Sequence, residues 1–385
     1  MRKSDRLLVG TIAALAWILT FGLSGTAMAF HAGGVAHCDG CHSMHDSPEN
    51  PVEGIANALL LKGTDPSSTC LNCHEGSGSY HILSDDGSDW SPGGDFFWLT
   101  QSYSNVVRGN TNTSDPDNMG HNVVAFDYGL TQDVTNTLAP GGTYPASSLG
   151  CSSCHDPHGQ VNGGTANGMD PISVSGSYGG IPVAGTIAGN YRLLGDPGYK
   201  PYIVNPAPIA VTSGFGETDT SHVAYGQGMS EWCANCHPQY TGSSTKHPAA
   251  NTEALGTDKA DTYNAYVATG DYTGGAGATA YTALVPFERQ ETNKATLLTA
   301  VTSTQGPDSL DDNVMCLTCH RAHASAFNNI TRWDMETAFL ASGYPSAANL
   351  TAMGAVANAD YYGRDIATDF GTYQRSLCNK CHVKD

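Results

Sequence analysis

One five-residue pattern, Cys-x-x-Cys-His, occurs six times and uses all 12 cysteines of this 385-residue chain. This spacing is the attachment signature of a c-type haem. Each cysteine forms a thioether with one haem vinyl group, and the histidine that follows lies under the iron. The sequence therefore predicts six covalently attached haem c groups, held by the pairs Cys38/Cys41, Cys70/Cys73, Cys151/Cys154, Cys233/Cys236, Cys316/Cys319 and Cys378/Cys381.

The rival interpretation of paired cysteines is a structural zinc protein. Zinc ribbons also pair C-x-x-C units, but they do not require a histidine after every second cysteine. That histidine is present in all six copies here, so the zinc interpretation is disfavoured. The predicted proximal iron ligands are His42, His74, His155, His237, His320 and His382.

Three of the six motifs carry a second histidine three residues after the first. A three-residue link spans about 10 Å when fully extended and about 5 Å in a helical turn. It cannot easily carry a side chain around the macrocycle edge to the opposite face of the same haem. The second histidine is therefore predicted to bind a different haem, which would tie two haems to one turn of chain. The pairs are His42/His45, His155/His158 and His320/His323.

The remaining histidines are sufficient to close every iron on both faces. Of 15 histidines, six are proximal, and two others are discounted because His37 touches the first motif and His222 has no motif around it. An iron with two histidine ligands has no position for a substrate, and its role is electron transfer. We expect a protein without catalytic activity; the alternative is a multihaem reductase with one open haem. The seven candidate distal ligands are His31, His45, His81, His121, His158, His247 and His323.

The N-terminus has the features of a secretory signal peptide. A basic start precedes an apolar run from Leu7 to about Leu23, and Ala27-Met28-Ala29 is a small-residue cleavage site. Residues 1–29 are therefore expected to be removed, and residues 30–385 to form a single hexahaem domain. No later stretch has 18 consecutive apolar residues, so the mature chain is not expected to span a membrane as a helix.

The formal charge of the chain is −19, and removal of three cations and one anion with the leader leaves −21. So acidic a chain should repel nucleic acid and remain soluble at neutral pH. We therefore expect no nucleic-acid partner.

The composition favours a loop-rich fold built on its cofactors. There are 45 glycines and 19 prolines, and six large flat haems would supply core that side chains must otherwise provide. The expected fold is a multihaem c-type cytochrome, mostly coil with a few short helices and minimal β-structure, wrapped around a row of six haems. Helices are expected over residues 51–64, within 251–310 and over 330–340, and Phe96-Phe97-Trp98 is expected to pack on porphyrin edges.

Segments along the whole mature chain resemble the outer-surface hexahaem nanowire cytochromes of metal-reducing bacteria. The run Val223-Ala-Tyr-Gly-Gln-Gly-Met-Ser-Glu-Trp232 before the fourth motif is not demanded by haem attachment, which makes it specific. The other matching segments are Phe30–Ala36, Cys38–His45, Cys151–Gly159, Cys316–Ser325 and Tyr373–His382.

The resemblance implies extracellular filaments of this one chain with a continuous haem stack. It also implies redox partner cytochromes as donors and extracellular electron acceptors such as metal oxides. In that family the histidine after the first motif binds a haem of the neighbouring protomer, a role that would fall on His45. The alternative is a monomeric periplasmic electron shuttle, because the residues alone do not say which distal histidine crosses a subunit boundary.

Overall fold

The computed structural model describes residues 38–43, 60–76, 81–87, 91–102, 104–107, 110–157, 191–211, 223–241, 249–269, 285–299, 307, 312–343, 361–363 and 365–382.

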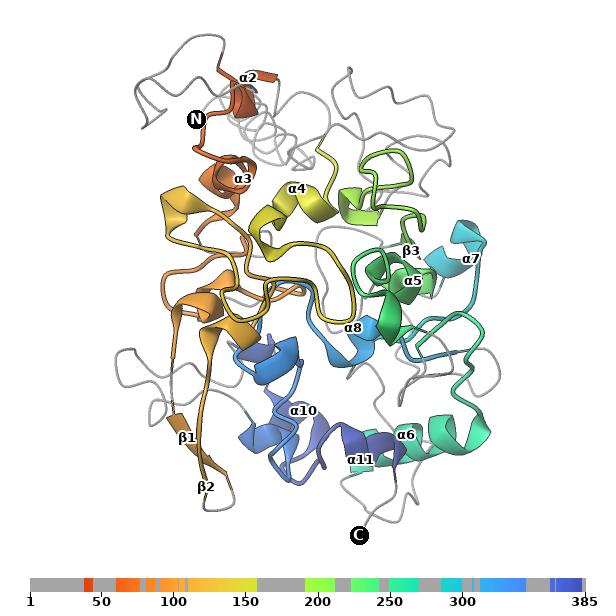
Figure 1. The fold of residues 1–385 in the computed structure, drawn as a ribbon. Helices are drawn as coiled ribbons and strands as arrows, with labels where there is room; N and C mark the ends of the chain where they lie inside the picture. Colours follow the sequence, from red (N-terminus) through yellow and green to blue (C-terminus); the bar gives the residue numbers. More distant parts are fainter. Residues whose placement is uncertain are drawn as a thin grey trace, which may run out of the picture.

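The six haem motifs lie on short helices that follow one another along the molecule. In Figure 1 the first motif is at the top, the sixth is at the bottom, and the others lie between them. Four of these helices are four-residue turns, and the other two end within the motif. The helices are α2 (Cys38–Cys41), α3 (Pro66–His74), α4 (Cys151–Cys154), α5 (Met229–Cys233), α8 (Cys316–Cys319) and α11 (Cys378–Cys381).

Helix α3 has a strong local start signal. The Asp65 carboxylate accepts hydrogen bonds from the Ser68 backbone N–H at 2.8 Å and from the Ser68 hydroxyl at 2.7 Å. Pro66 occupies the first helical turn, where its missing N–H costs nothing. Asp65 also accepts the backbone N–H of Phe126 at 2.8 Å, so the same side chain joins α3 to a distant loop.

The other helices within the described residues are also short. They are α6 (Thr257–Thr269), α7 (Lys294–Leu298) and α10 (Ile366–Phe370). The described 3-10 helices are η1 (Phe96–Thr100), η2 (Pro116–Asn118), η3 (Phe126–Tyr128), η4 (Ala146–Ser148), η6 (Tyr191–Leu193), η7 (Pro238–Tyr240), η9 (Asn328–Ile330) and η10 (Leu340–Ser342).

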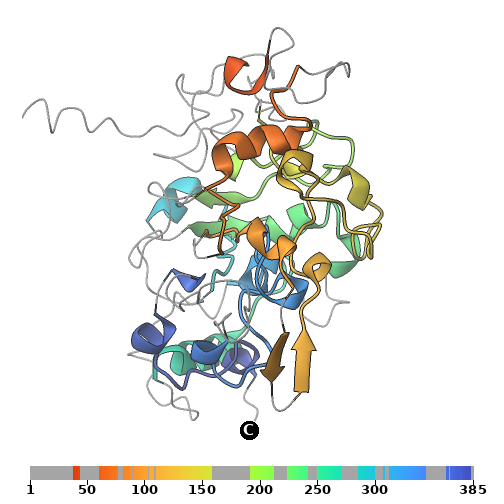
Figure 2. The same cartoon turned by 90° about the vertical axis from the view of Figure 1, so that its left-hand side faces the viewer.

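The described β-structure consists of two small antiparallel sheets. Strands β1 (Ser104–Val107) and β2 (Asn110–Thr113) form a hairpin at the lower end of the molecule, visible in both views (Figures 1 and 2). Strands β3 (Ile209–Val211) and β4 (Ala224–Gln227) pair with a register irregularity after Ile209. With short helices and little sheet, the structure agrees with the predicted fold class.

The largest buried cluster of the described residues is rich in aromatic rings. Trp98 packs edge-on against Tyr361 with ring centroids 5.7 Å apart, and Trp333 stacks on Tyr362 at 4.5 Å. Phe96 and Phe97, from the same helix η1 as Trp98, are buried in this cluster. The predicted packing of this aromatic run on porphyrin edges stays a prediction.

The expected helices have mixed outcomes. Helices α6 and α7 fall within residues 251–310, as expected. The expected helix over 51–64 lies mostly outside the described residues, and residues 60–64 are not helical. The described part of the chain contains no helix long and apolar enough to cross a bilayer. The predicted leader, residues 1–29, lies outside the described residues.

The expected helix over residues 330–340 is wrong. Thr331 forms a bridge with His320 and Phe339 one with Arg375, which draws both ends into extended backbone. Between them, the Asp334 carboxylate accepts the Glu336 N–H at 2.8 Å, an arrangement typical of a turn. The apolar residues of this stretch therefore pack into the core from a bent segment and not from one face of a helix.

Candidate haem sites

Three proximal histidines share one hydrogen-bonding arrangement. The Nδ1 atom of His155 lies 2.8 Å from the Arg192 carbonyl, that of His237 lies 2.8 Å from the Pro140 carbonyl, and that of His320 lies 2.7 Å from the Asn329 carbonyl. A carbonyl accepts only, so Nδ1 must carry the proton and Nε2 is left with its lone pair for a metal. Metal-binding histidines are typically oriented in this way.

The structure brings His155 and His323 together. Their ring centroids lie 6.2 Å apart, with 62° between the ring planes. With metal–nitrogen bonds of about 2 Å and about 1 Å from each nitrogen to its ring centre, two imidazoles on one metal have centres roughly 6 Å apart. The spacing of this pair fits one iron between a proximal histidine of the third motif and the second histidine of the fifth.

His121 and His237 form a second pair of the same kind. Their ring centroids are 6.0 Å apart and the planes are tilted by 45°. Nδ1 of His121 lies 2.7 Å from the Ala322 carbonyl, so this distal candidate is oriented like the proximal ones. The pair matches one iron at the fourth motif.

Burial keeps these imidazoles neutral. Burial, and then the nearby His155, lower the pKa of His323 to about 3. Burial, and then the nearby His237, lower the pKa of His121 to about 4. A neutral imidazole is the form that binds a metal, so both rings are in the ligating state at neutral pH.

The turn from His320 to His323 is a hub for three motifs. His320 is the proximal histidine of the fifth motif, and His323 faces His155 of the third. His121 faces His237 of the fourth motif and is held by two hydrogen bonds to this turn. Its backbone N–H donates to the His323 carbonyl at 2.8 Å, and its ring Nδ1 donates to the Ala322 carbonyl. One turn of chain thus fixes side chains directed to three consecutive attachment sites.

Of the other five predicted distal histidines, the structure describes one, His81. The His81 ring lies near Gly76, two residues after the second motif, with Nε2 4.0 Å from the position that a Cβ on Gly76 would take. His31, His45, His158 and His247 lie outside the described residues. Their ligand roles therefore stay predictions.

Cysteines of successive motifs lie next to one another. A hydrogen bond to the Cys151 side chain, followed by burial, raises the pKa of Cys70, and a hydrogen bond to Cys316, followed by burial, does the same for Cys233. Helix α3 correspondingly contacts α4, and α5 contacts α8. These contacts join the second motif to the third and the fourth to the fifth.

The remaining links between motifs are weaker but consistent with one order. After burial, nearby Cys236 raises the pKa of Cys154, and nearby Cys378 raises that of Cys319. Cys41 contributes similarly to the raised pKa of Cys70, after Cys151 and burial. The attachment sites are thus neighbours in chain order, from the first motif to the sixth.

Cys73 is exposed, unlike most of the predicted attachment cysteines. Among the cysteines whose burial the structure describes, Cys73 and Cys378 are exposed, whereas the rest are partly buried. The reason at Cys73 is its place on α3. It follows the fully buried Leu71 by two residues, and two residues turn an α-helix by about 200°, so Cys73 lies on the face opposite the packed one. The protein alone does not enclose this predicted attachment point, and its thioether to the second haem stays a prediction.

In each of the three motifs that carry a second histidine, a later stretch of chain folds back and pairs with the motif. These stretches, residues 60–62, 193–195 and 330–332, are called the return segments. The residue after the proximal histidine donates its N–H to the return segment, and the segment donates an N–H to the carbonyl of the second cysteine. The pairs, at 2.6–2.9 Å, are Ser43–Leu60 with Lys62–Cys41, Asp156–Leu193 with Gly195–Cys154, and Arg321–Ile330 with Arg332–Cys319.

The return segments contain strained backbone. Leu60, Leu193 and Ile330 all have positive φ, between 53° and 59°, which is uncommon for bulky residues. In the last two segments the preceding residue, Arg192 or Asn329, also has positive φ and offers its carbonyl to the proximal histidine. Sequence reasoning missed these segments because their only common signal is one Leu or Ile in an unremarkable loop.

Comparison with known proteins decides the family. No protein-family model matches the sequence. The C-type cytochrome OmcS of Geobacter sulfurreducens is 42% identical, and the match covers 97% of this chain and 98% of that protein. This chain belongs to the OmcS family of c-type cytochromes.

Solved structures of OmcS agree with the family. The cryo-EM structure of OmcS nanowires from Geobacter sulfurreducens has a TM-score of 0.74 at 41% identity and covers 92% of this chain and 100% of that one. A structure of the outer membrane cytochrome S filament gives a TM-score of 0.73 at 40% identity, with the same coverage. The predicted resemblance and fold class are confirmed, and as a c-type cytochrome the chain carries covalently attached haem c, for which its sequence contains six attachment motifs.

Proposed function

We propose that this OmcS-family protein is a secreted electron conduit that assembles into filaments of the same chain. In this proposal electrons enter from redox partner cytochromes, pass along six bis-histidine haems, and leave to extracellular acceptors such as metal oxides. The main support for this proposal is that two pairs of histidines face each other, each with ring centroids about 6 Å apart. The two members of each pair come from different segments of the chain.

The order of the attachment sites supports conduction along one row. Haem iron, when bound, supplies the reversible ferric–ferrous couple that carries the electron. The chain contributes the spacing: cysteines of successive motifs are neighbours, and the hub turn from His320 to His323 directs side chains to three of the sites. Electrons could then move between neighbouring sites without any moving part of the protein.

The axial ligands argue against a reductase. An iron held between His155 and His323, or between His237 and His121, would have a histidine on both sides and no position for a substrate. The remaining distal ligands would come from His31, His45, His81, His158 and His247. A cavity lined by Ser91, Asp95, Arg321 and Tyr361, among others, measures about 10 Å³, which is the space of roughly one water molecule.

Assembly is the part of the proposal that rests on relatives. Both similar structures are described as OmcS nanowires or filaments. His45 is the residue that we expect to bind a haem of the next protomer. Export fits the predicted leader over residues 1–29 and the acidic mature chain.

Ligand binding separates the conduit from the reductase. In the oxidised protein all six haems are expected to be low-spin, and cyanide or nitrite should leave the visible and electron paramagnetic resonance (EPR) spectra unchanged, because both axial positions are filled. A high-spin ferric fraction that shifts on addition of cyanide would contradict the closed-iron claim and favour the reductase.

A further inference from the structure

The imidazole of His323 is enclosed by the segment Ser91–Phe96. The Phe96 ring stacks on it, with centroids 5.0 Å apart and 28° between the planes. A Cβ added to Gly93 would lie only 2.7 Å from Nδ1 of His323 and 2.9 Å from Cε1. The backbone is joined as well, because the His323 N–H donates to the Gly93 carbonyl at 2.7 Å. The ring therefore has little freedom to rotate about its bond to the chain.

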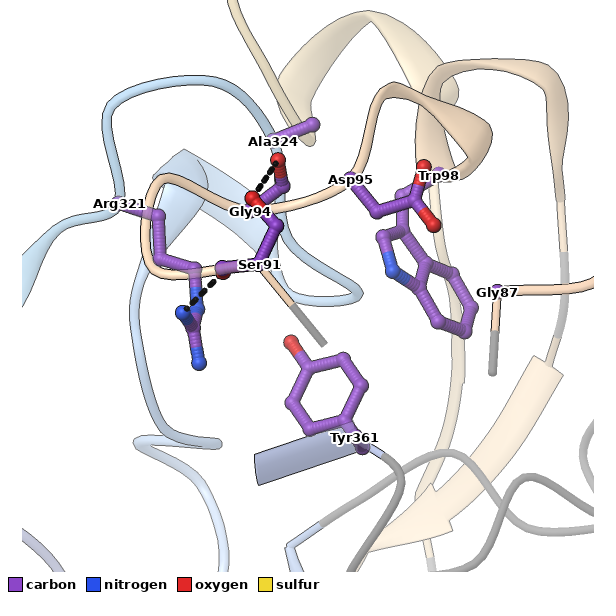
Figure 3. A pocket seen from close by; sticks show the side chains of 8 residues that line it. All are labelled: Gly87, Ser91, Gly94, Asp95, Trp98, Arg321, Ala324 and Tyr361. Carbon is purple, nitrogen blue, oxygen red and sulfur yellow. Dashed lines mark hydrogen bonds between the residues drawn. The ribbon is translucent and has the colours of Figure 1, made fainter. Parts of the chain in front are cut away.

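Arg321 holds the turn at the start of this segment. Its guanidinium donates from one nitrogen to the carbonyls of both Ser91 and Pro92, each at 3.1 Å. It lies 6.0 Å from the Tyr361 ring centroid, at the small cavity shown in Figure 3. The side chain is 7% exposed, so these bonds are made away from solvent. The turn is thus tied to the same hub that carries His323.

Gly94 makes this close approach possible. Its φ is +94°, and a Cβ there would lie 1.8 Å from the Ala324 carbonyl oxygen. No other residue fits that position without displacing the backbone. The close contact at Gly94 fixes the distance between Ser91–Phe96 and the turn that carries His323. The hydrogen bonds of Arg321 fix the orientation of Ser91–Phe96 on that turn.

The orientation of an axial imidazole has electronic consequences. When two imidazoles bind one ferric iron, the angle between their planes sets how strongly the iron d orbitals are split. A steep angle gives a highly anisotropic low-spin EPR signal, and near-parallel planes give a more rhombic one. Groups around a metal ligand orient it and tune the metal. The 62° angle between His155 and His323 is therefore a property that the surrounding chain can set.

We propose that Ser91–Phe96, held by Arg321, is a clamp that fixes the imidazole plane of His323 and so sets the electronic asymmetry of the haem between His155 and His323. Gly93 and Phe96 are the positioning residues of this clamp. The inference rests on the proposed pairing of those two histidines as axial ligands. It assigns a role to η1 that is separate from packing the core.

EPR of the oxidised hexahaem protein tests the clamp. Phe96→Leu removes the stacked ring without introducing a clash. The largest g value of one of the six low-spin components is expected to shift, while the other five stay in place and all six remain low-spin. Gly93→Ala presses on the same ring and should move the same component. Phe287→Leu is the matched control, because Phe287 is a buried ring of the same cluster but packs edge-on against Tyr263, with centroids 4.9 Å apart; it should shift nothing.

His323→Met distinguishes failure of the clamp from failure of the ligand pair. If His323 is a ligand, this variant converts one haem to histidine–methionine ligation and produces a methionine-to-iron charge-transfer band. Absence of that band contradicts the pairing itself. If the band appears but Phe96→Leu leaves the EPR spectrum unchanged, or changes it no more than Phe287→Leu does, the clamp is wrong and the pairing stands.

Discussion

Produced without haem attachment, the chain is expected to be unfolded. Helices α2, α4, α8 and α11 are four-residue turns, and α4, α8 and α11 have no side-chain N-cap. Helices this short are not stable by themselves in water. The haems provide the apolar surface on which the loops pack, as metals do in small domains that unfold without them. Far-UV circular dichroism and limited proteolysis of protein made in cells without the attachment machinery would measure this.

The control is the same chain exported and loaded with six haems, which should resist protease and unfold cooperatively on heating. A haem-free chain that still shows a cooperative thermal transition would contradict this prediction. In that case the aromatic cluster around Trp98, Trp333 and Tyr361 would be a sufficient core.

His45→Ala is expected to abolish filaments while leaving the protomer folded. If His45 binds a haem of the next protomer, its loss removes one axial ligand at every subunit boundary. One haem in six should then become high-spin, and electron microscopy and light scattering should show monomers. The effect on assembly is large because the lost bond is a metal–ligand bond that is repeated at each subunit boundary. The effect on the spectra is large because one iron of the six loses a histidine ligand.

His222→Ala is the matched control, since His222 is a histidine with no haem motif around it. That variant should form filaments with six low-spin haems, like the unmodified protein. If His45→Ala also forms such filaments, the assignment of His45 to the subunit boundary is wrong.

Attachment chemistry was readable from the sequence because it is local. Two thioethers and a proximal histidine require five consecutive residues, and each of the six motifs lies on a short helix or at its end. The composition was equally informative about fold class, since many glycines and prolines together with six cofactors leave little need for long helices or sheets. The family followed from segments such as Val223–Trp232 that haem attachment does not demand.

The pairing of distal histidines was not readable, because it depends on contacts between distant segments. Nothing near His121 in the sequence points to His237, and nothing near His323 points to His155. The sequence argument did predict that a histidine three residues after a proximal one serves another haem, and the position of His323 supports this. It could not say which haem, since that depends on how the return segments fold the chain.

The return segments and the wrongly expected helix share one cause. Asn329 and Ile330 adopt positive φ where the chain turns back to bridge with His320. The backbone bonds to Cys319 and Arg321 override the apolar spacing that favoured a helix over residues 330–340. At this point the long-range hydrogen bonds between the return segment and the haem motif outweigh the local helix propensity of the sequence.

The central claim is a continuous row of closed haems that runs through a polymer of this chain. Cryo-electron microscopy of the secreted, haem-loaded protein tests it most directly. The account predicts filaments with six haems per protomer in motif order, His155 with His323 and His237 with His121 as axial pairs, and a histidine ligand crossing each subunit boundary. Isolated protomers, a gap in the row, or an iron with an open axial position would contradict it.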